Sequence, residues 1–256
     1  MEFFDSHAHY NDEKFSHDDE DIIKKIYREG ITSVVVAGYN LKSSKEAVRL
    51  ANQYHYLYAI CGISPNDINE DTNRDIERIE ELSKKNKKVI AMGEIGLDYY
   101  WNKENKERQK QCFIKQIEVA NQLKLPIVIH SRDASIDTIE ILNNTNANQK
   151  GVFHCCQLNM ELIREALKLG FYISFAGPIT YKNVKNAEEI VKSVPLDKVL
   201  IETDSPYLAP EPLRGTRNNS INVKRIAQKI ADIKGISLEE TAKITYENAK
   251  KAFHLS

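Results

Sequence analysis

Cysteine and net charge are both scarce in this sequence, and each shortage excludes a class of protein. Four of the 256 residues are cysteine, and no two of them form a C-x-x-C pair. Such usage is typical of reduced, buried thiols and argues against a disulfide framework. The formal net charge of −1 provides no overall attraction for nucleic acid or an anionic membrane. Binding of a polyanion would therefore need a local patch or a bound cation.

The chain also lacks long hydrophobic runs and several familiar motifs. No apolar stretch approaches the length of a membrane span. Met1-Glu2 leads directly into the first predicted strand, which leaves no room for a signal peptide, so we expect a cytoplasmic protein. There is no G-x-G-x-x-G run after the first strand, no P-loop and no G-x-S-x-G elbow. These absences disfavour a nucleotide-binding fold and a serine nucleophile.

Short apolar runs alternate along the whole chain with longer amphipathic, charge-rich runs. The apolar runs predict eight strands, at residues 3–9, 31–37, 57–63, 89–95, 126–131, 151–156, 171–176 and 199–203. A helical pattern follows each of them, and a further helix ends the chain. Strands that alternate with helices form a parallel sheet. Eight such units in a single domain of residues 1–256 predict an α/β fold, the (β/α)8 TIM barrel, with a doubly wound open sheet as the alternative.

Potential metal ligands occur at the ends of five of these strands. In a barrel the carboxyl ends of the strands meet at one mouth. Four histidines and two carboxylates are found there: His7, His9, Glu94, His130, His154 and Asp204. Residues two apart on a strand share a face, so Asp5, His7 and His9 are expected to project together. Singly, each residue could be a solvated strand end or a buried histidine bonded to the backbone; their coincidence predicts a metal site.

Six ligands are more than one tetrahedral zinc ion requires. They suit two divalent ions that share a bridging carboxylate, and Glu94 is the natural bridge because it comes from the middle of the circuit. Such ions clamp the attacking and leaving oxygens of a displacement and lower the pKa of a bound water. Mixed nitrogen and oxygen ligands suit Mg, Mn or Zn without choosing among them. Asp5 and Glu202 either orient a ligand histidine or serve as buried structural carboxylates.

Four sequence motifs stand in the same order as the predicted strands. They are Asp5-Ser6-His7-Ala8-His9, Gly93-Glu94-Ile95-Gly96-Leu97-Asp98, His130-Ser131-Arg132-Asp133-Ala134 and Glu202-Thr203-Asp204-Ser205-Pro206-Tyr207-Leu208. Together they resemble the TatD family of metal-dependent deoxyribonucleases, from the first strand to the last helix. The resemblance implies an amidohydrolase-like barrel, two divalent metal ions and hydrolysis of DNA phosphodiesters, commonly as a 3′–5′ exonuclease.

The resemblance also implies roles for the six ligands. One metal would be held by His7, His9, Glu94 and Asp204, and the other by Glu94, His130 and His154. Asp204 would in addition be the general base for the attacking water, so that Asp204 and Glu94 are the catalytic residues.

Three segments depart from the pattern usual in the family. They are Ser64-Pro65-Asn66 after the third strand, Cys155-Cys156-Gln157-Leu158 after the sixth, and Arg217-Asn218-Asn219-Ser220 after the eighth. The six ligands are retained beside all three. We expect the altered residues to shape the mouth of the site and to affect substrate preference and rate more than the type of reaction.

Several side chains near the predicted mouth are candidates for substrate contacts. The candidate phosphate clamps are Arg132, Arg214 and Arg217. A guanidinium matches a phosphate with two parallel hydrogen bonds, although each arginine could equally be a solvated surface residue. Tyr99 and Trp101 follow the fourth strand, where they could stack on the bases of a single strand or pack against the barrel rim.

The sequence leaves three functions open. The leading hypothesis is a hydrolase of DNA phosphodiesters whose substrate is single-stranded DNA or a 3′ end. The second keeps the water-activating site but changes the bond to an amide, lactone or ester, and an apolar mouth without cationic residues would favour it. The third is a catalytically altered binding relative, against which the intact ligand set argues. We expect no membrane association, no obligate protein partner and a monomer.

Overall fold

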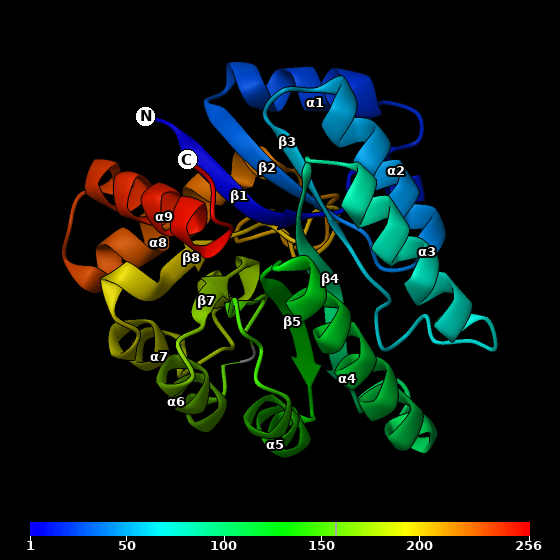
Figure 1. The fold of residues 1–256 in the computed structure, drawn as a ribbon. Coiled ribbons are helices and arrows are strands. Elements are labelled where there is room, and N and C mark those ends of the chain that lie inside the picture. Colours follow the sequence, from blue (N-terminus) through cyan, green and yellow to red (C-terminus); the bar gives the residue numbers. More distant parts are fainter. Residues whose placement is uncertain (157) are drawn as a thin grey trace.

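Eight parallel strands, paired in the order of the chain, form the centre of the molecule (Figure 1). The structure is a computed structural model and describes residues 1–156 and 158–256. The strands are β1 (Phe3–Ala8), β2 (Ile31–Ala37), β3 (Leu57–Cys61), β4 (Val89–Asp98), β5 (Ile127–Arg132), β6 (Gly151–Phe153), β7 (Tyr172–Phe175) and β8 (Val199–Ile201). Their number and order confirm the predicted (β/α)8 barrel, because a doubly wound sheet would reverse its strand order.

The sheet closes on itself through residues that follow β8. Ser205 forms a parallel bridge with Ala8, and the amide of Asp204 donates a hydrogen bond to the carbonyl of His7 at 2.9 Å. The carboxylate of Asp5 accepts hydrogen bonds from the amide of Thr203 at 2.9 Å and from its hydroxyl at 2.6 Å. Backbone and side-chain bonds therefore join the two ends of the sheet.

The helices lie around the outside of the strands (Figure 1). They are α1 (Asp19–Arg28), α2 (Leu41–Gln53), α3 (Thr72–Lys85), α4 (Lys106–Leu123), α5 (Ser135–Thr145), α6 (Met160–Lys168), α7 (Ala187–Ser193), α8 (Val223–Lys234) and α9 (Leu238–Ala252). Short 3-10 turns occur at η1 (Glu13–Phe15), η2 (Lys103–Asn105), η3 (Gly177–Thr180), η4 (Leu196–Lys198) and η5 (Ser220–Asn222). Apolar residues at helical spacing, such as Ile23 and Ile26 of α1, are buried, as expected of amphipathic helices that cover a sheet.

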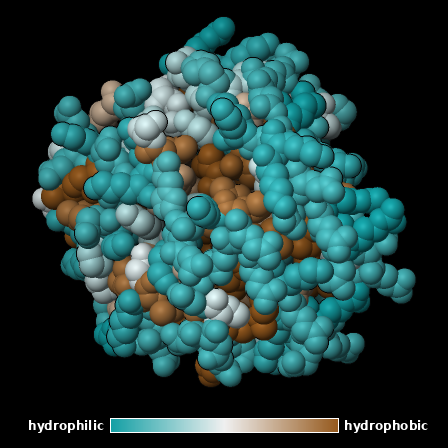
Figure 2. Space-filling model, viewed as in Figure 1, coloured by the Kyte–Doolittle hydropathy of each residue, from teal (hydrophilic) through white to brown (hydrophobic). Residues whose placement is uncertain are grey.

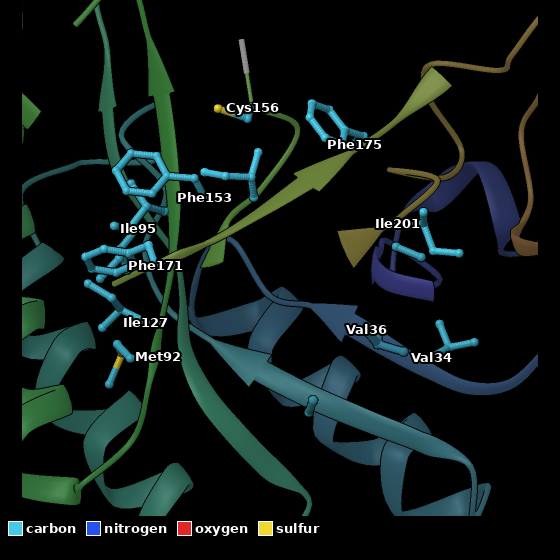
Figure 3. Close-up of a cluster of buried hydrophobic side chains, with 14 of the residues drawn as sticks. Val34, Val36, Met92, Ile95, Ile127, Phe153, Cys156, Phe171, Phe175 and Ile201 are labelled. Atoms are coloured by element: carbon cyan, nitrogen blue, oxygen red, sulfur yellow. The ribbon is translucent and has the colours of Figure 1, made fainter. Parts of the chain in front are cut away.

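Alternation along the strands divides the apolar side chains into two layers. One layer, which we place inside the barrel, includes Phe4, Val35, Ile60, Val128, Val152, Leu200 and, from the end of α9, Phe253. The other layer lies between the sheet and the helices and includes Ile127, Phe153 and Phe171 (Figure 3). Since each stands two residues beyond an interior side chain of its own strand, His130, His154 and Glu202 project toward the mouth of the barrel.

Strand β1 departs from this alternation, and the departure corrects one expectation from the sequence. Its register with β2 shifts between Asp5 and Ala8. Asp5 therefore does not share a face with His7 and His9, because its carboxylate bonds to Thr203 while both imidazoles approach Glu94. A local irregularity reverses the parity of the residues on either side of it. Asp5 is a structural carboxylate at the barrel closure and does not orient a ligand ring.

The outer surface has the polarity expected from the amphipathic runs. On the face shown in Figure 2, hydrophilic residues cover most of the surface and hydrophobic residues show mainly toward its centre. No helix within the described ranges is long and apolar enough to cross a membrane.

Candidate metal centre

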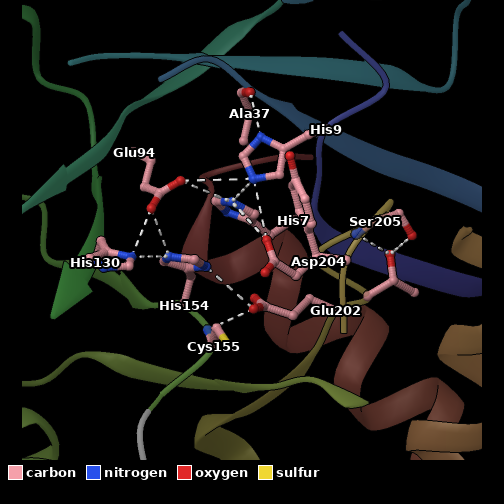
Figure 4. Close-up of polar contacts among 12 residues, drawn as sticks. His7, His9, Ala37, Glu94, His130, His154, Cys155, Glu202, Asp204 and Ser205 are labelled. Atoms are coloured by element: carbon pink, nitrogen blue, oxygen red, sulfur yellow. Dashed lines mark hydrogen bonds and ion pairs between the residues drawn. The ribbon is translucent and has the colours of Figure 1, made fainter. Parts of the chain in front are cut away.

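The six ligands proposed from the sequence meet at the carboxyl end of the barrel, with Glu94 between them (Figure 4). Oε2 of Glu94 lies 3.6 Å from Nε2 of His7 and 3.8 Å from Nε2 of His9. Oδ1 of Asp204 lies 3.2 Å from Nε2 of His9 and 3.9 Å from Nε2 of His7. These four side chains form the first group of potential ligands.

The other oxygen of Glu94 faces a second group. Oε1 lies 2.8 Å from Nδ1 of His130 and 3.3 Å from Nε2 of His154. The two nitrogens are 3.3 Å apart. Because its two oxygens serve different groups, Glu94 has the position that a bridging carboxylate requires.

Hydrogen bonds outside the centre decide which nitrogen of two histidines faces it. Nδ1 of His9 lies 3.1 Å from the carbonyl oxygen of Ala37, which can only accept, so Nδ1 carries the proton and Nε2 presents its lone pair. In His130 the roles are reversed, since Nε2 lies 3.0 Å from Oδ2 of Asp98 and leaves Nδ1 for the centre. Metal-binding histidines are oriented in this way by carbonyls and carboxylates.

Glu202 stands in a corresponding position beside His154. Its Oε1 accepts a hydrogen bond from the amide of Cys155 at 2.6 Å and lies 3.4 Å from Nδ1 of His154. Nδ1 of His7 is buried without a hydrogen-bond partner among the described residues. Ligand atoms of His7, His154 and Glu202 also lie within 4.8 Å of one another. We assign Glu202 to positioning these two imidazoles, because their Nε2 atoms already face Glu94.

Electrostatics keep the carboxylates of the centre ionised. Burial by itself raises the pKa of Glu94, but the surrounding histidines, His154 first, hold this pKa well below its usual range. Burial likewise opposes ionisation of Asp98, yet hydrogen bonds from His130 and from the amide of Trp101 lower its pKa to about 2. Burial lowers the pKa of His154, but the carboxylates of Glu94 and Glu202 raise it well above its ordinary value. These ionised carboxylates therefore stabilise a positive charge in the space between the side chains of the centre.

The donor set fits divalent cations. The Nε2 atoms of His7 and His9 lie 3.2 Å apart, and two facing imidazole nitrogens can share only one proton, whereas a cation between them accepts both lone pairs. Ligands bound to one ion at about 2.0–2.2 Å lie roughly 3–3.5 Å from one another, which is the range of several separations in both groups. Each group combines nitrogen with carboxylate oxygen, a set suited to Zn or Mn and, through its oxygens, to Mg.

The centre opens into a cavity of about 990 Å³. Five of the six potential ligands line this cavity, and only His7 is absent from its wall. Part of the wall is apolar and consists of Leu158, Phe175, Ala176, Pro178, Ile179, Val184 and Leu208. Among the described residues, Arg132 is the one lysine or arginine that lines the cavity.

The structure separates the predicted substrate contacts into two sets. Arg132 and Trp101 line the cavity. Tyr99 does not, because it is buried and donates its hydroxyl to Oδ2 of Asp137 at 2.6 Å. Tyr99 therefore lies away from the surface that a substrate would contact, whereas Trp101 faces the cavity.

The two arginines after β8 also lie away from the cavity wall. Arg217 is held in a bidentate ion pair with the carboxylate of Asp18 and donates to the carbonyl of Lys14. Arg214 stacks on Tyr181 at 4.4 Å and donates to Asn183 at 3.3 Å. Both guanidinium groups thus have protein partners, and the structure does not bring these two candidate phosphate clamps to the cavity wall.

The segments that depart from the family pattern also divide. Ser64 and Asn66 line the cavity, as do Cys156 and Leu158, while Gln157 lies outside the described residues. Asn219 instead accepts a hydrogen bond from the amide of Ile221 and begins η5. Ser220 is buried and bonds to Tyr10. The expectation that all three segments shape the mouth is therefore wrong for the segment after β8.

Asp98 belongs to the site although it was not proposed as a functional residue, and Asn66, which was expected to shape the mouth, is bonded to it. Oδ2 of Asp98 accepts hydrogen bonds from Nε2 of His130 and from Nδ2 of Asn66 at 3.1 Å. One signal in the sequence could have identified Asp98: it lies four residues after Glu94 and so shares its parity on a strand. The predicted end of that strand at residue 95 concealed this relation.

The chain is similar in sequence to a family and to proteins described as metal-dependent hydrolases. Residues 4–254 match the family described as TatD related DNase. The "uncharacterized metal-dependent hydrolase YabD" of Bacillus subtilis (strain 168) is 42% identical over 254 residues, which cover 99% of each chain. The "uncharacterized metal-dependent hydrolase YcfH" of Escherichia coli (strain K12) is 35% identical over 259 residues, covering 100% of this chain and 97% of the relative.

Solved structures show the same fold at lower sequence identity. The crystal structure of YJJV, a TatD homolog from Escherichia coli K12, superposes with a TM-score of 0.93 at 24% identity and covers 99% of this chain and 98% of that chain. An uncharacterized amidohydrolase from Saccharomyces cerevisiae has a TM-score of 0.87 at 16% identity, covering 99% of this chain and 100% of the other. The amidohydrolase-like barrel expected from the sequence is thereby confirmed.

Proposed function

Because the chain belongs to the TatD family of metal-dependent hydrolases, we propose that it hydrolyses DNA phosphodiesters with two divalent metal ions, as a 3′–5′ exodeoxyribonuclease. The observation that carries this proposal is the position of Glu94, whose two oxygens face two separate groups of ligands. Two ions bound there would neutralise charge on the phosphoryl oxygens and lower the pKa of an attacking water.

The chain's own residues supply the remaining parts of the reaction. Asp204 lines the cavity and lies 3.2 Å from His9. Burial opposes its ionisation, but a hydrogen bond from His9 holds its pKa below the usual range. As an ionised carboxylate beside the metal centre, it is placed to accept the proton of the attacking water. Hydrogen bonds that two ligand rings donate to Asp98 and to the carbonyl of Ala37, and Glu202 beside a third ring, position the ligands so that they need not reorganise during the displacement.

Degradation of 5′-labelled single-stranded DNA tests the proposal. The protein is stripped of metal with a chelator and then supplied with Mg, Mn or Zn, with Glu94→Ala assayed beside it and the exposed Glu104→Gln as a control for the loss of a carboxylate. We expect a ladder that shortens from the 3′ end, needs a metal ion and is lost only in Glu94→Ala. The absence of cleavage with every metal, while the protein binds metal stoichiometrically, would contradict the proposal.

A second candidate is hydrolysis of a neutral ester, lactone or amide at the same centre. The apolar part of the cavity wall, from Phe175 to Ile179 and at Val184, favours it. Arg132 in the wall favours an anionic substrate instead. Aryl esters and phosphodiesters assayed in parallel would discriminate, because only phosphodiester turnover should depend on the charge of Arg132.

The partner that follows from the leading proposal is single-stranded DNA or a 3′ end. With a net charge of −1, the chain would attract it through bound cations and Arg132 and not through its overall field. We propose that the protein acts as a monomer in the cytoplasm, which sedimentation with and without DNA and cell fractionation would test.

A further inference from the structure

The cavity wall presents an aromatic ring and a cation side by side. Trp101 is 69% exposed and lines the cavity. The guanidinium of Arg132, at the end of β5, lies 3.8 Å from the ring centre of Tyr100 and 5.6 Å from that of Trp101. The two rings themselves meet edge to face at 4.8 Å. Tyr100 is 49% exposed beside Trp101, so two adjacent aromatic rings face solvent next to the candidate metal centre.

The loop that carries the two rings is fixed to the metal centre by Asp98. Oδ1 of Asp98 accepts hydrogen bonds from the amides of Tyr100 at 2.9 Å and Trp101 at 3.0 Å. Its Oδ2 accepts from His130 at 3.0 Å. One carboxylate thus orients both the His130 ring and the aromatic loop. Trp101 is therefore held at a defined place relative to the metal centre before a substrate binds.

Arg132 differs from Arg217 because its charge has no acidic partner, and from Arg214 because it lines the cavity. Its guanidinium makes no hydrogen bond or ion pair with the residues that the structure describes, and stacking on the two rings holds its plane. Stacking leaves the five N–H donors at the edge of the guanidinium available to a ligand. An unpaired, half-buried cation in the wall of this cavity has the chemistry to bind a phosphate.

We propose that Trp101 and Arg132 form a nucleotide subsite in which the indole stacks on the base of the substrate's terminal nucleotide and the guanidinium binds a phosphate of the same strand. This inference rests on the proposed nuclease function. It adds that the enzyme recognises a base together with a phosphate of the same strand. Stacking on aromatic rings tolerates any base, so the subsite would select for the presence of a base and against an abasic sugar.

Fluorescence offers a direct readout, because Trp101 is the single tryptophan of the chain. The metal-loaded wild-type protein is titrated with a trinucleotide made cleavage-resistant by phosphorothioate linkages, and binding is followed in parallel by the anisotropy of a labelled copy. We expect saturable quenching of the tryptophan emission that follows the anisotropy curve, and no quenching when the terminal nucleotide is abasic. Binding by anisotropy with unchanged emission would overturn the subsite.

Cleavage kinetics separate the two side chains. The wild-type kcat/KM should be roughly 5- to 150-fold higher for strands with a 3′-terminal base than for strands with an abasic 3′ end. This is the range expected from stacking one base on an aromatic ring. Trp101→Ala should abolish this ratio, chiefly by slowing the cleavage of strands with a 3′-terminal base, and Trp101→Phe should restore part of it. Arg132→Gln should slow both strands by roughly 10- to 100-fold.

The control variant is Tyr27→Ala. Tyr27 is a partly exposed aromatic residue near the end of α1, which leads into the amino end of β2 and thus lies at the opposite end of the barrel. It should leave all rates unchanged. Wild-type cleavage with a ratio that persists in Trp101→Ala would overturn the subsite and leave the nuclease function standing. A wild type that neither binds nor cleaves DNA would overturn both.

Discussion

At the scale of single residues, Asp98 connects a metal ligand, His130, with the aromatic loop that carries Tyr100 and Trp101. Its carboxylate accepts four hydrogen bonds, from His130, Asn66, Tyr100 and Trp101. A carboxylate with all its acceptor positions occupied in a buried place has one geometry, and this fixes Nδ1 of His130 toward Glu94.

Asp98→Asn should weaken the binding of the metal held by His130. The amide cannot accept from His130, Tyr100 and Trp101 together in the same way as two carboxylate oxygens, and loss of such a partner lowers metal affinity by about 10- to 100-fold. Competition with a fluorescent chelator would measure this. Asp137→Asn is the matched control, because Asp137 bonds to Tyr99 and Lys110 outside the cavity, and equal affinities in the two variants would refute the role of Asp98.

Residue types and spacing were sufficient to predict all six side chains that meet in the centre, since parity on a strand brings residues two apart to one face. For Tyr99 the alternative to base stacking, packing against the barrel rim, was correct, since its hydroxyl bonds to Asp137. The same rule failed for Asp5, where a register shift in β1 intervenes. It also could not anticipate Arg217, whose partner Asp18 lies 199 positions earlier in the chain. Pairings between distant segments leave no local pattern in the sequence.

At the scale of elements, the strands that carry ligands end where the backbone changes direction. β6 ends at Phe153 and β8 at Ile201, whereas the apolar runs predicted strands to residues 156 and 203. Cys155 and Asp204 then adopt left-handed backbone conformations, with φ of 39° and 55°. Such conformations are uncommon for residues other than glycine and cluster at functional sites. Hydrophobic runs alone do not reveal these turns, and so the predicted strands were too long.

Strand β4 shows the opposite difference, since it continues to Asp98 where the apolar run predicted an end at residue 95. Gly96 makes this possible. It has φ of 141°, and a Cβ at this position would lie 1.9 Å from the carbonyl oxygen of His130. The close approach of β4 and β5 at the level of the ligands therefore requires glycine.

Gly96→Ala should destabilise the fold by more than about 3 kcal/mol, because both its conformation and its contact with β5 become unfavourable. Urea unfolding would measure the loss. Gly235→Ala provides the comparison: its φ is also positive, at 68°, but nothing lies within 4 Å of its Cβ, so the expected cost is only about 1–2 kcal/mol. A smaller loss in Gly96→Ala than in Gly235→Ala would contradict the proposed close approach.

At the scale of the whole molecule, the barrel separates a stabilising end from a reactive end. Phe4 stacks on Tyr58 and Phe253, with ring centres 6.3 and 6.1 Å apart, so the first strand and the end of the last helix pack on the same interior layer. The ligands lie further along the chain toward the carboxyl ends of the strands, His130 and His154 two residues beyond the interior side chains of Val128 and Val152. The alternation of strands and helices was enough to predict this architecture, because parallel strands need crossover connections.

Metal binding should stabilise the whole fold, since the ligands come from strands at both ends of the sequence and assemble only in the native state. Free metal at 100 times its Kd should raise Tm by about 5–10 °C for a chain of this length. Differential scanning fluorimetry of chelator-stripped protein would show the shift. Glu94→Gln should reduce it and Glu104→Gln should not, and a Tm that is indifferent to metal in the wild type would argue against the centre.

Anomalous diffraction from crystals grown with Mn or Zn would show whether Glu94 bridges two metal ions. We expect two anomalous peaks, one among His7, His9 and Asp204 and the other between His130 and His154, with Glu94 between them. Their separation should be about 3.5–4 Å, as in other two-metal hydrolytic sites. A single peak, or two peaks that do not share Glu94, would mean that this carboxylate does not bridge two ions.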